Sequence, residues 1–213
     1  MTGVSIDAGG ATIDGDLIVP DGAVGVVAFA HGSGSSRHSP RNKSVAGRLN
    51  AAGLATLLVD LLTRDEEEVD LRTRELRFDI GLLARRLSAA TIFLTHEPET
   101  ATLPLGYFGA STGAAAALIA AAEHVDRIGA VVSRGGRPDL ADDALAKVGA
   151  PTLLVVGGRD AAVLDLNRQA LARLTVEKRL AVVPGATHLF EEPGTLERVA
   201  DLASAWYADH LAG

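Results

Sequence analysis

The stretch Leu105-Gly106-Tyr107-Phe108-Gly109-Ala110-Ser111-Thr112-Gly113 decides the fold of this 213-residue chain. An apolar run of strand length at residues 105–108 leads straight into Gly-x-Ser-x-Gly, and an Ala-rich helical segment at 112–123 follows. In a strand-to-helix turn of this kind, glycines on both sides let the turn push the serine hydroxyl out over the end of the strand. We therefore predict a nucleophile elbow at Ser111; the alternative is a glycine-rich turn in which this serine only caps the helix.

The elbow stands in a chain of alternating strands and helices. Apolar runs of strand length occur at residues 25–30, 55–59, 105–108, 128–132, 152–156 and 180–183, after two short β-prone runs at 4–6 and 11–19. Helical segments are expected at 41–52, 69–87, 112–123, 164–174 and 195–211. Runs that are apolar at consecutive positions are typical of strands buried on both faces of a parallel sheet. The alternation predicts an α/β fold with a doubly wound, mostly parallel sheet flanked by helices.

Length and composition indicate a single globular domain over residues 1–213. Hydrophobic residues make up 47% and charged residues 22%, which excludes disordered, collagen-like and coiled-coil chains. The formal charge of −7 argues against nucleic acid or an anionic membrane as a partner, because both repel an acidic protein. The chain has no cysteine, which excludes a disulfide scaffold, a thiolate metal site and a cysteine nucleophile.

The location and assembly of the protein are expectations of the same kind. The first residues lack the basic and apolar regions of a signal peptide, so we expect a cytoplasmic protein, monomeric or homodimeric. The uncharged stretch at 100–122 is long enough to cross a bilayer. It contains Pro104 and several glycines, however, and alanine makes up about half of the rest. We expect two elements joined by a turn there.

Two further strand ends carry the residues that a serine nucleophile needs. A serine hydroxyl is a weak nucleophile unless a base removes its proton and a third group orients that base. His188 follows a predicted strand and a Pro-Gly turn, and Asp160 follows the strand at 152–156, with Asp165 as the fallback acid. The order Ser111, Asp160, His188 is that of the serine hydrolases built on an α/β sheet and differs from the orders of chymotrypsin and subtilisin.

The segment His31-Gly32-Ser33-Gly34-Ser35-Ser36 follows the predicted strand at 25–30. An acyl-transfer site needs two N–H groups aimed at the carbonyl oxygen as it becomes an oxyanion. Thr112, the residue after the candidate nucleophile, would supply one N–H group, and Ser33 or Gly34 the other. A phosphate-cradling loop is the competing interpretation, but the lysine of a P-loop and the pattern Gly-x-Gly-x-x-Gly are both missing.

Together, the elbow, the His31-Gly32-Ser33-Gly34 loop, Asp160 and the segment Gly185-Ala186-Thr187-His188-Leu189-Phe190-Glu191 resemble the α/β-hydrolase superfamily, and more narrowly the small dienelactone-hydrolase-like proteins. The resemblance extends from about residue 23 to the C-terminus. It implies an eight-stranded, mostly parallel sheet and a Ser/Cys–His–Asp triad with no metal or organic cofactor. The enzyme that gives this family its name uses a cysteine nucleophile. Because serine stands at that position here, the resemblance favours a general esterase over an enzyme specific for dienelactone.

The residues around the predicted site bear on the substrate. The connection at 134–150 has room for one short helix but not for a helical lid, which predicts an open, shallow site for small acyl groups. Arg134 and Arg137 could bind a substrate carboxylate, with His31 as another possible substrate contact. Alternatively, the arginines pair with the acidic residues of their own loop: Asp139, Asp142 and Asp143. A second basic cluster after the glycine-rich loop could add to the same field: Arg37, His38, Arg41 and Lys43.

The function expected from these residues is a cofactor-independent serine hydrolase that cleaves small carboxylic esters or lactones through an acyl-enzyme. A thioesterase or a small peptidase would use the same triad and differ only in the leaving group. A binding protein that holds a small molecule on the same fold without turnover is the alternative from another class.

Overall fold

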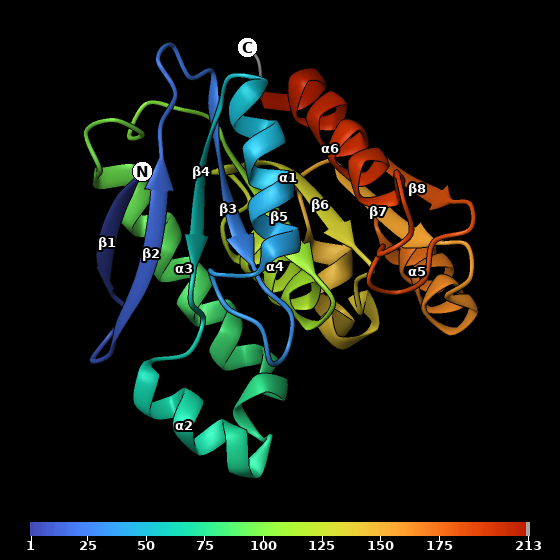
Figure 1. Ribbon diagram of the computed structural model, residues 1–213, viewed down its shortest axis with the longest axis horizontal. Coiled ribbons are helices and arrows are strands. Elements are labelled where there is room, and N and C mark those ends of the chain that lie inside the picture. Colours follow the sequence, from blue (N-terminus) through green and yellow to red (C-terminus); the bar gives the residue numbers. More distant parts are fainter. Residues whose placement is uncertain (212–213) are drawn as a thin grey trace.

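The structure is a computed structural model and describes residues 1–211. Its centre is an eight-stranded sheet with the order β1-β2-β4-β3-β5-β6-β7-β8 (Figure 1). The strands are β1 (Thr2–Asp7), β2 (Thr12–Ile18), β3 (Gly25–Ala30), β4 (Leu54–Val59), β5 (Leu105–Ala110), β6 (Ile128–Arg134), β7 (Thr152–Gly157) and β8 (Lys178–Val183). Strands β3 to β8 run parallel, and the pairings of β1 with β2 and of β2 with β4 are antiparallel. The predicted α/β architecture is confirmed.

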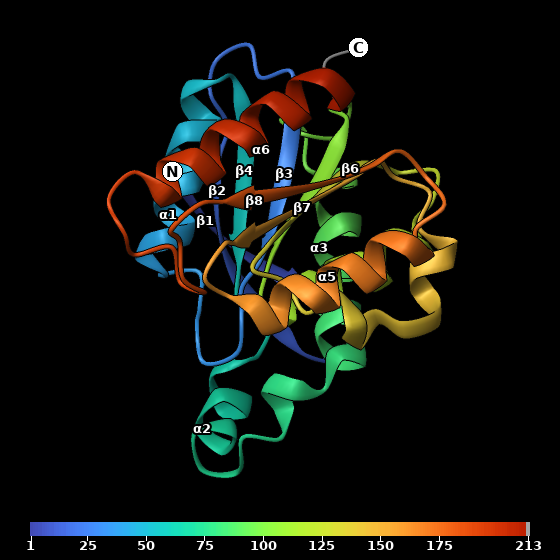
Figure 2. The ribbon, with the colours of Figure 1, turned by 90° about the vertical axis from the view of Figure 1, so that its right-hand side faces the viewer.

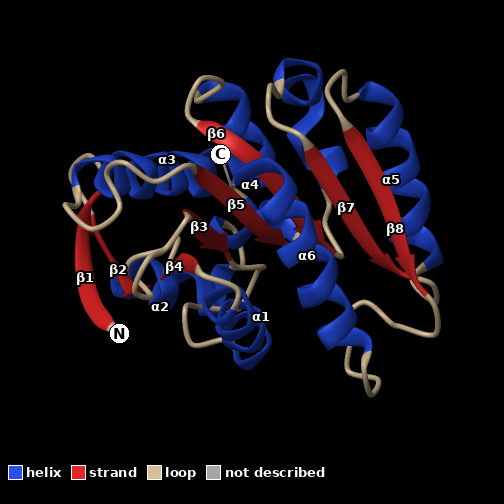
Figure 3. Cartoon of the chain, turned by 90° about the horizontal axis from the view of Figure 1, so that it is seen from above, coloured by secondary structure: helices blue, strands red, loops and turns tan. Residues whose placement is uncertain are grey.

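Helices cover both faces of this sheet, as the views in Figures 2 and 3 show. On one face lie α1 (Pro40–Ala51) and α6 (Thr195–Leu211), and on the other α3 (Ile80–His96), α4 (Thr112–Glu123) and α5 (Ala161–Arg173), with the 3₁₀ segment η2 (Pro138–Lys147). All six residues of each of the strands β3, β4, β5 and β7 are buried. The uninterrupted apolar runs follow from this burial, since a strand covered on both faces has no polar side.

The alanine-rich helix α4 lies against the middle of the sheet. Nine of its residues are buried, and six of these are alanine. Such small side chains let a helix pack close to the strands beneath it. Because α4 follows β5 directly, its N-terminus is held at the carboxyl ends of the central strands, where ligands bind in open α/β sheets.

The single helix predicted at 69–87 is wrong. The chain forms α2 (Arg64–Thr73), the 3₁₀ turn η1 (Leu76–Phe78) and α3 in its place. Helix α2 ends because Arg74 adopts a left-handed conformation with φ of 60°. Helix α3 begins afresh because the carboxylate of Asp79 accepts the N–H of Leu82 at 2.9 Å. The α2–η1 segment extends beyond the carboxyl ends of the strands in Figure 1.

The break also changes which side chains are covered. Leu71 and Phe78, which lie within the range of the predicted helix, are 68% and 57% exposed. The uncharged stretch at 100–122 divides into β5 and α4 on either side of Ser111, as expected. Within residues 1–211, no helix combines the length and the apolar character that a bilayer crossing demands.

Candidate active site

Ser111 lies in the turn between β5 and α4 with φ of 51° and ψ of −121°, a conformation that residues other than glycine rarely adopt. The flanking glycines are required by close packing. A side-chain carbon at Gly109 would overlap the backbone of Ala114, and one at Gly113 would overlap the carbonyl oxygen of Ala30. The turn is therefore the strained elbow that the sequence predicts, and it holds Ser111 half-exposed above the sheet.

His188 and Asp160 meet at the ends of the neighbouring strands. Asp160 directly precedes α5, and its Oδ2 lies 2.6 Å from Nδ1 of His188. An Nδ1–H that donates to this carboxylate leaves Nε2 of the ring free to accept a proton. Asp165, the fallback acid, is exposed and pairs with Arg168 at 2.9 Å instead. The structure thus brings Asp160, not Asp165, to the histidine.

Ser111 and His188 line one pocket, a cavity of about 250 Å³ at the carboxyl end of the sheet. Within residues 1–211, the Ser111 hydroxyl and the His188 ring do not form a hydrogen bond with each other. Catalytic hydrogen bonds are often long before substrate binds and tighten in the complex. Ser111, the candidate nucleophile, and His188, the candidate base held by Asp160, thus border one open space.

The loop that carries His188 is held by contacts that sequence reasoning missed. The carboxylate of Glu192 accepts the N–H of Thr187 at 3.0 Å, and hydrogen bonding from Thr187 lowers the pKa of Glu192. On the other side, the N–H of Arg159 donates to the carbonyl of Ala186 at 2.9 Å. A pair of glutamates before a helix resembles ordinary capping, so no sequence signal distinguished the role of Glu192.

In the glycine-rich loop after β3, the N–H of Ser33 donates to Oγ1 of Thr112 at 2.9 Å. One of the expected oxyanion donors therefore has a partner already. Thr112 is the first residue of α4, so its own N–H lacks a partner within the helix. Gly34 follows with φ of 70°. The loop and the helix N-terminus thus face each other across the place expected for the oxyanion.

His31, expected as a possible substrate contact, has another role. It is 8% exposed, its Nδ1 donates to the carbonyl of Gly32 at 2.9 Å, and its Nε2 accepts the N–H of Leu61 at 3.1 Å. Burial lowers the pKa of His31, in keeping with a neutral ring that uses both nitrogens. His31 ties the glycine-rich loop to the end of β4 and has no ring nitrogen left for a substrate.

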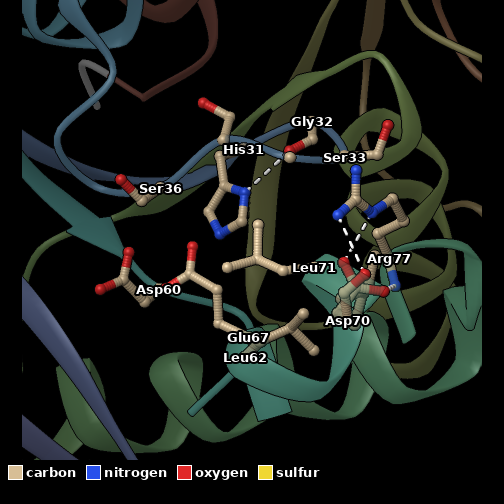
Figure 4. A pocket seen from close by; sticks show the side chains of 13 residues that line it. His31, Gly32, Ser33, Ser36, Asp60, Leu62, Glu67, Asp70, Leu71 and Arg77 are labelled. Carbon is tan, nitrogen blue, oxygen red and sulfur yellow. Dashed lines mark hydrogen bonds and ion pairs between the residues drawn. The ribbon is translucent and has the colours of Figure 1, made fainter. Parts of the chain in front are cut away.

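A second, smaller cavity of about 50 Å³ lies behind the same loop (Figure 4). The guanidinium of Arg77 donates from Nε to Oδ2 of Asp70 at 2.6 Å, and the Arg77 N–H donates to Oδ1 of the same carboxylate at 2.9 Å. Nη1 of Arg77 lies against Gly34, 3.2 Å from where a side-chain carbon would stand. The α2–η1 segment thus supports the loop from behind.

The two candidate arginines after β6 differ. Arg137 donates two hydrogen bonds to Asp139, at 2.9 and 2.7 Å, so it forms the pair within its own loop that was the alternative. Arg134 is 6% exposed and lines the pocket of Ser111. The remaining loop acids both pair with one arginine of α5: Asp142 and Asp143 with Arg173.

Of the second basic cluster, only Arg41 lines this pocket. Arg37 forms an ion pair with Asp60 instead, outside the pocket of Ser111. Lys43 and His38 are exposed, and neither lines the pocket. Arg134 and Arg41 are therefore the cations that reach the site.

Comparison with solved structures supports the fold. The dienelactone hydrolase from Anabaena variabilis is 61% identical, with a TM-score of 0.97 over 99% of this chain and 97% of that one. Est1E from Butyrivibrio proteoclasticus is 18% identical, with a TM-score of 0.82 over 99% of both chains. At 18% identity the second likeness concerns the fold alone.

Among curated proteins, two from Mycobacterium tuberculosis, strains CDC 1551 and H37Rv, are 60% identical over 210 residues. They are provisionally named phosphoribosyl transferases. The match covers 99% of this chain but 46% of theirs, so the chain spans about half the length of these relatives. The model of the dienelactone hydrolase family matches residues 13–209. With nearly the whole chain matched and a strained serine elbow beside a His–Asp pair, this protein belongs to the dienelactone hydrolase family.

Proposed function

We propose that this protein is a serine hydrolase that cleaves small carboxylic esters or lactones through an acyl-enzyme. The observation that carries the proposal is the 2.6 Å contact between Nδ1 of His188 and Asp160, in a pocket that His188 shares with Ser111. A carboxylate on Nδ1 fixes the tautomer in which Nε2 can accept a proton from a hydroxyl. Every step of such a hydrolysis forms or breaks a C–O bond or moves a proton, so the chemistry calls for no cofactor.

In the first half-reaction, Oγ of Ser111 attacks the carbonyl carbon while Nε2 of His188 takes the hydroxyl proton. Asp160 stabilises the resulting imidazolium without taking its proton. The negative oxygen of the tetrahedral intermediate is met by the N–H of Thr112 and by an N–H of the loop at Ser33 and Gly34. The intermediate collapses, His188 gives its proton to the departing alkoxide, and the acyl group stays on the serine.

In the second half-reaction, water takes the place of the alcohol. His188 removes a proton from the water as its oxygen attacks the acyl carbon. The new intermediate expels the serine oxygen, which regains its proton from the imidazolium. The products are a carboxylic acid and the free enzyme; a lactone gives both functional groups in one hydroxy acid.

The surroundings of Ser111 support small substrates. The connection between β6 and β7 holds only η2, with a kink at Asp142, and no helical lid. The cavity of about 250 Å³ is smaller than most small-molecule sites, which typically span roughly 300–1,000 Å³, and so suits a short acyl group. The α2–η1 segment extends past the sheet but borders the second cavity behind the loop. A short acyl group would thus reach the serine from solvent.

Thioesters and small peptides remain substrate alternatives on the same residues, and a binding protein without turnover remains the alternative from another class. We do not extend the transferase name of the longer relatives to this chain, since about half of their length has no counterpart in it.

Labelling with a fluorophosphonate probe tests the nucleophile. We expect labelling of the wild-type protein and its loss in Ser111→Ala, with a burst of p-nitrophenol from p-nitrophenyl acetate in the wild type only. Ser88→Ala is a matched control, because Ser88 lies on α3 and bonds to Glu123 at 3.1 Å. Labelling that persists in Ser111→Ala contradicts the assignment, and a wild type that neither labels nor turns over esters supports the binding protein.

A further inference from the structure

Arg134 is a buried cation without an anion. It is 6% exposed at the end of β6, where its carbonyl accepts the N–H of Ser111 at 3.2 Å. Its Nη2 donates to Oδ1 of Asn42 at 3.2 Å, and its guanidinium lies 5.9 Å from the ring centre of Phe190. Nε has no partner, and no carboxylate of residues 1–211 forms an ion pair with Arg134. Buried arginines are almost always paired, so this one calls for an anion.

A second arginine faces the same space. Arg41 lines the pocket with Arg134, and its Nε is buried without a partner among the described residues. Its Nη1 lies 3.5 Å from Oε1 of Glu191, whose side chain is 65% exposed. Burial, together with the charge of Arg41, lowers the pKa of Arg134 to about 10. Two neighbouring cations repel each other, and burial removes them from water. An anion bound between them would offset both the repulsion and the loss of hydration.

The first turn of α1 completes the arrangement. Ser39 caps this helix by accepting the N–H of Asn42 at 3.3 Å, and both residues line the pocket. The N-terminal turn of α1, with the positive end of the helix dipole, therefore borders the same pocket as the two arginines. The loop after β3 adds the hydroxyl-bearing residues Ser33 and Ser35 to the same lining.

We propose that this pocket binds a phosphate group carried by the substrate, through Arg134, Arg41 and the first turn of α1, and so holds the reacting ester beside Ser111. The hydrolysis of such a substrate rests on the proposed function, whereas the binding of the anion in this pocket does not. The serine and its neighbouring cation are coupled through the backbone, because the N–H of Ser111 donates to the carbonyl of Arg134. The substrate class is then an ester or lactone that bears a phosphomonoester elsewhere in the molecule.

The donors favour phosphate over a carboxylate. They come from three elements: the end of β6, the first turn of α1 and the loop after β3. A carboxylate has two oxygens in one plane, whereas a phosphomonoester has three free oxygens that point in different directions. Its charge of about −1.5 to −2 at neutral pH matches two guanidinium groups better than a single negative charge does.

A purely structural role for Arg134 predicts a different result. Through Asn42 and Phe190 it links β6 to α1 and to the segment after His188, so its loss could loosen the site. Loosening lowers turnover of neutral and anionic esters alike. Loss of an anion site weakens the binding of phosphate and selectively affects the anionic ester.

Inorganic phosphate is the probe for the test. At constant ionic strength it should inhibit hydrolysis of a neutral p-nitrophenyl ester competitively, and do so better than acetate or chloride. Arg134→Gln and Arg41→Gln should each weaken this inhibition by about tenfold or more, since each removes charged hydrogen bonds to the anion. Arg48→Gln, an exposed change at the other end of α1, should leave it unchanged. A p-nitrophenyl ester of a phosphonobutyrate should lose more kcat/KM in the first two variants than the pentanoate ester does.

Three outcomes would overturn the inference: phosphate that inhibits no better than chloride, inhibition that both variants retain, or acetate that binds as tightly as phosphate. If Arg134→Gln does not fold, the result for Arg41→Gln tests the anion site by itself. The side chain of Arg41 is 35% exposed, so it tolerates replacement more readily. If the wild type hydrolyses no ester, the proposed function fails. Calorimetric titration of phosphate into the wild type and Arg41→Gln then still decides whether the anion site exists.

Discussion

The main-chain N–H of Ser33 donates a hydrogen bond of 2.9 Å to Oγ1 of Thr112, which joins the loop after β3 to the first residue of α4. These two residues lie 79 positions apart in the chain and are the two expected sources of oxyanion donors. The bond fixes their separation, and it occupies a donor that the reaction would use. Thr112 thereby controls the geometry of the oxyanion site through its side chain as well as its backbone.

Replacing Thr112 with valine tests that role. Valine keeps the shape of the side chain but lacks the Oγ1 that accepts the Ser33 N–H, so the loop after β3 is held less firmly. We expect kcat to fall by roughly 3- to 10-fold, which corresponds to the net free energy of one hydrogen bond. Thr112→Ser retains the hydroxyl and should keep most of the activity. Steady-state kinetics on a p-nitrophenyl ester measures both variants. A valine variant faster than wild type would show instead that the hydroxyl competes with the oxyanion for the Ser33 N–H.

The acid of the His–Asp pair gives a sharper prediction. Asp160→Asn keeps the shape but presents an amide to Nδ1 of His188, which favours the wrong tautomer of the ring. We expect kcat to fall by roughly a thousandfold or more, with the fold intact by circular dichroism. The matched control is Asp165→Asn, an exposed residue of α5 paired with Arg168. If the Asp165 variant loses activity and the Asp160 variant does not, the assignment of the acid is wrong.

Those parts of the site that depend on strand ends were predictable from the sequence. In a parallel sheet the carboxyl ends of the strands share one edge, so residues directly after β5 and β7 converge whatever their separation in the chain. Ser111 and Asp160 therefore needed only the correct strands. His188 followed in the same way from the loop after β8.

Side-chain pairing was not predictable in this way. Arg134 ends β6 and Arg137 lies three residues further on, yet the first is buried without a carboxylate and the second pairs with Asp139. Between them the chain turns at Gly135, with φ of 51°, and the composition of the segment does not show which arginine remains unpaired. Likewise, the helical periodicity of apolar residues at 69–87 continues across the break at Arg74. A left-handed residue and a new helix cap do not change the spacing of apolar residues, so the break was not predictable from it.

The buried ring of His31 should make the free energy of unfolding depend on pH. Burial lowers the pKa of His31 below its ordinary value of 6.5, so the unfolded chain binds this proton more readily than the folded one. The free energy of unfolding should therefore decrease as the pH falls below about 6.5. Urea unfolding at pH 7.5 and 5.5 measures the difference. His31→Gln removes the titrating group and should reduce this dependence on pH; an unchanged dependence would assign it to other groups.

The ion pair of Arg77 with Asp70, behind the glycine-rich loop, should contribute to the stability of the fold. Asp70 is 2% exposed and takes hydrogen bonds from both the backbone and Nε of Arg77. Arg77→Met leaves that buried carboxylate without its cationic partner and with backbone N–H donors alone, which should lower the free energy of unfolding by about 2 kcal/mol or more. Adding Asp70→Asn removes the unpaired charge and should recover part of the loss. Arg72→Met, an exposed change on α2, is the control.

Because Nη1 of Arg77 lies against Gly34, the same variant should also affect the reaction. A loop that has lost its rear contact holds its N–H groups less firmly toward the oxyanion, which lowers kcat with little change in KM. Thermal unfolding and steady-state kinetics on the same preparations separate the two effects. If Arg77→Met destabilises the fold but leaves kcat at the wild-type value, the α2–η1 segment supports the domain without positioning the loop.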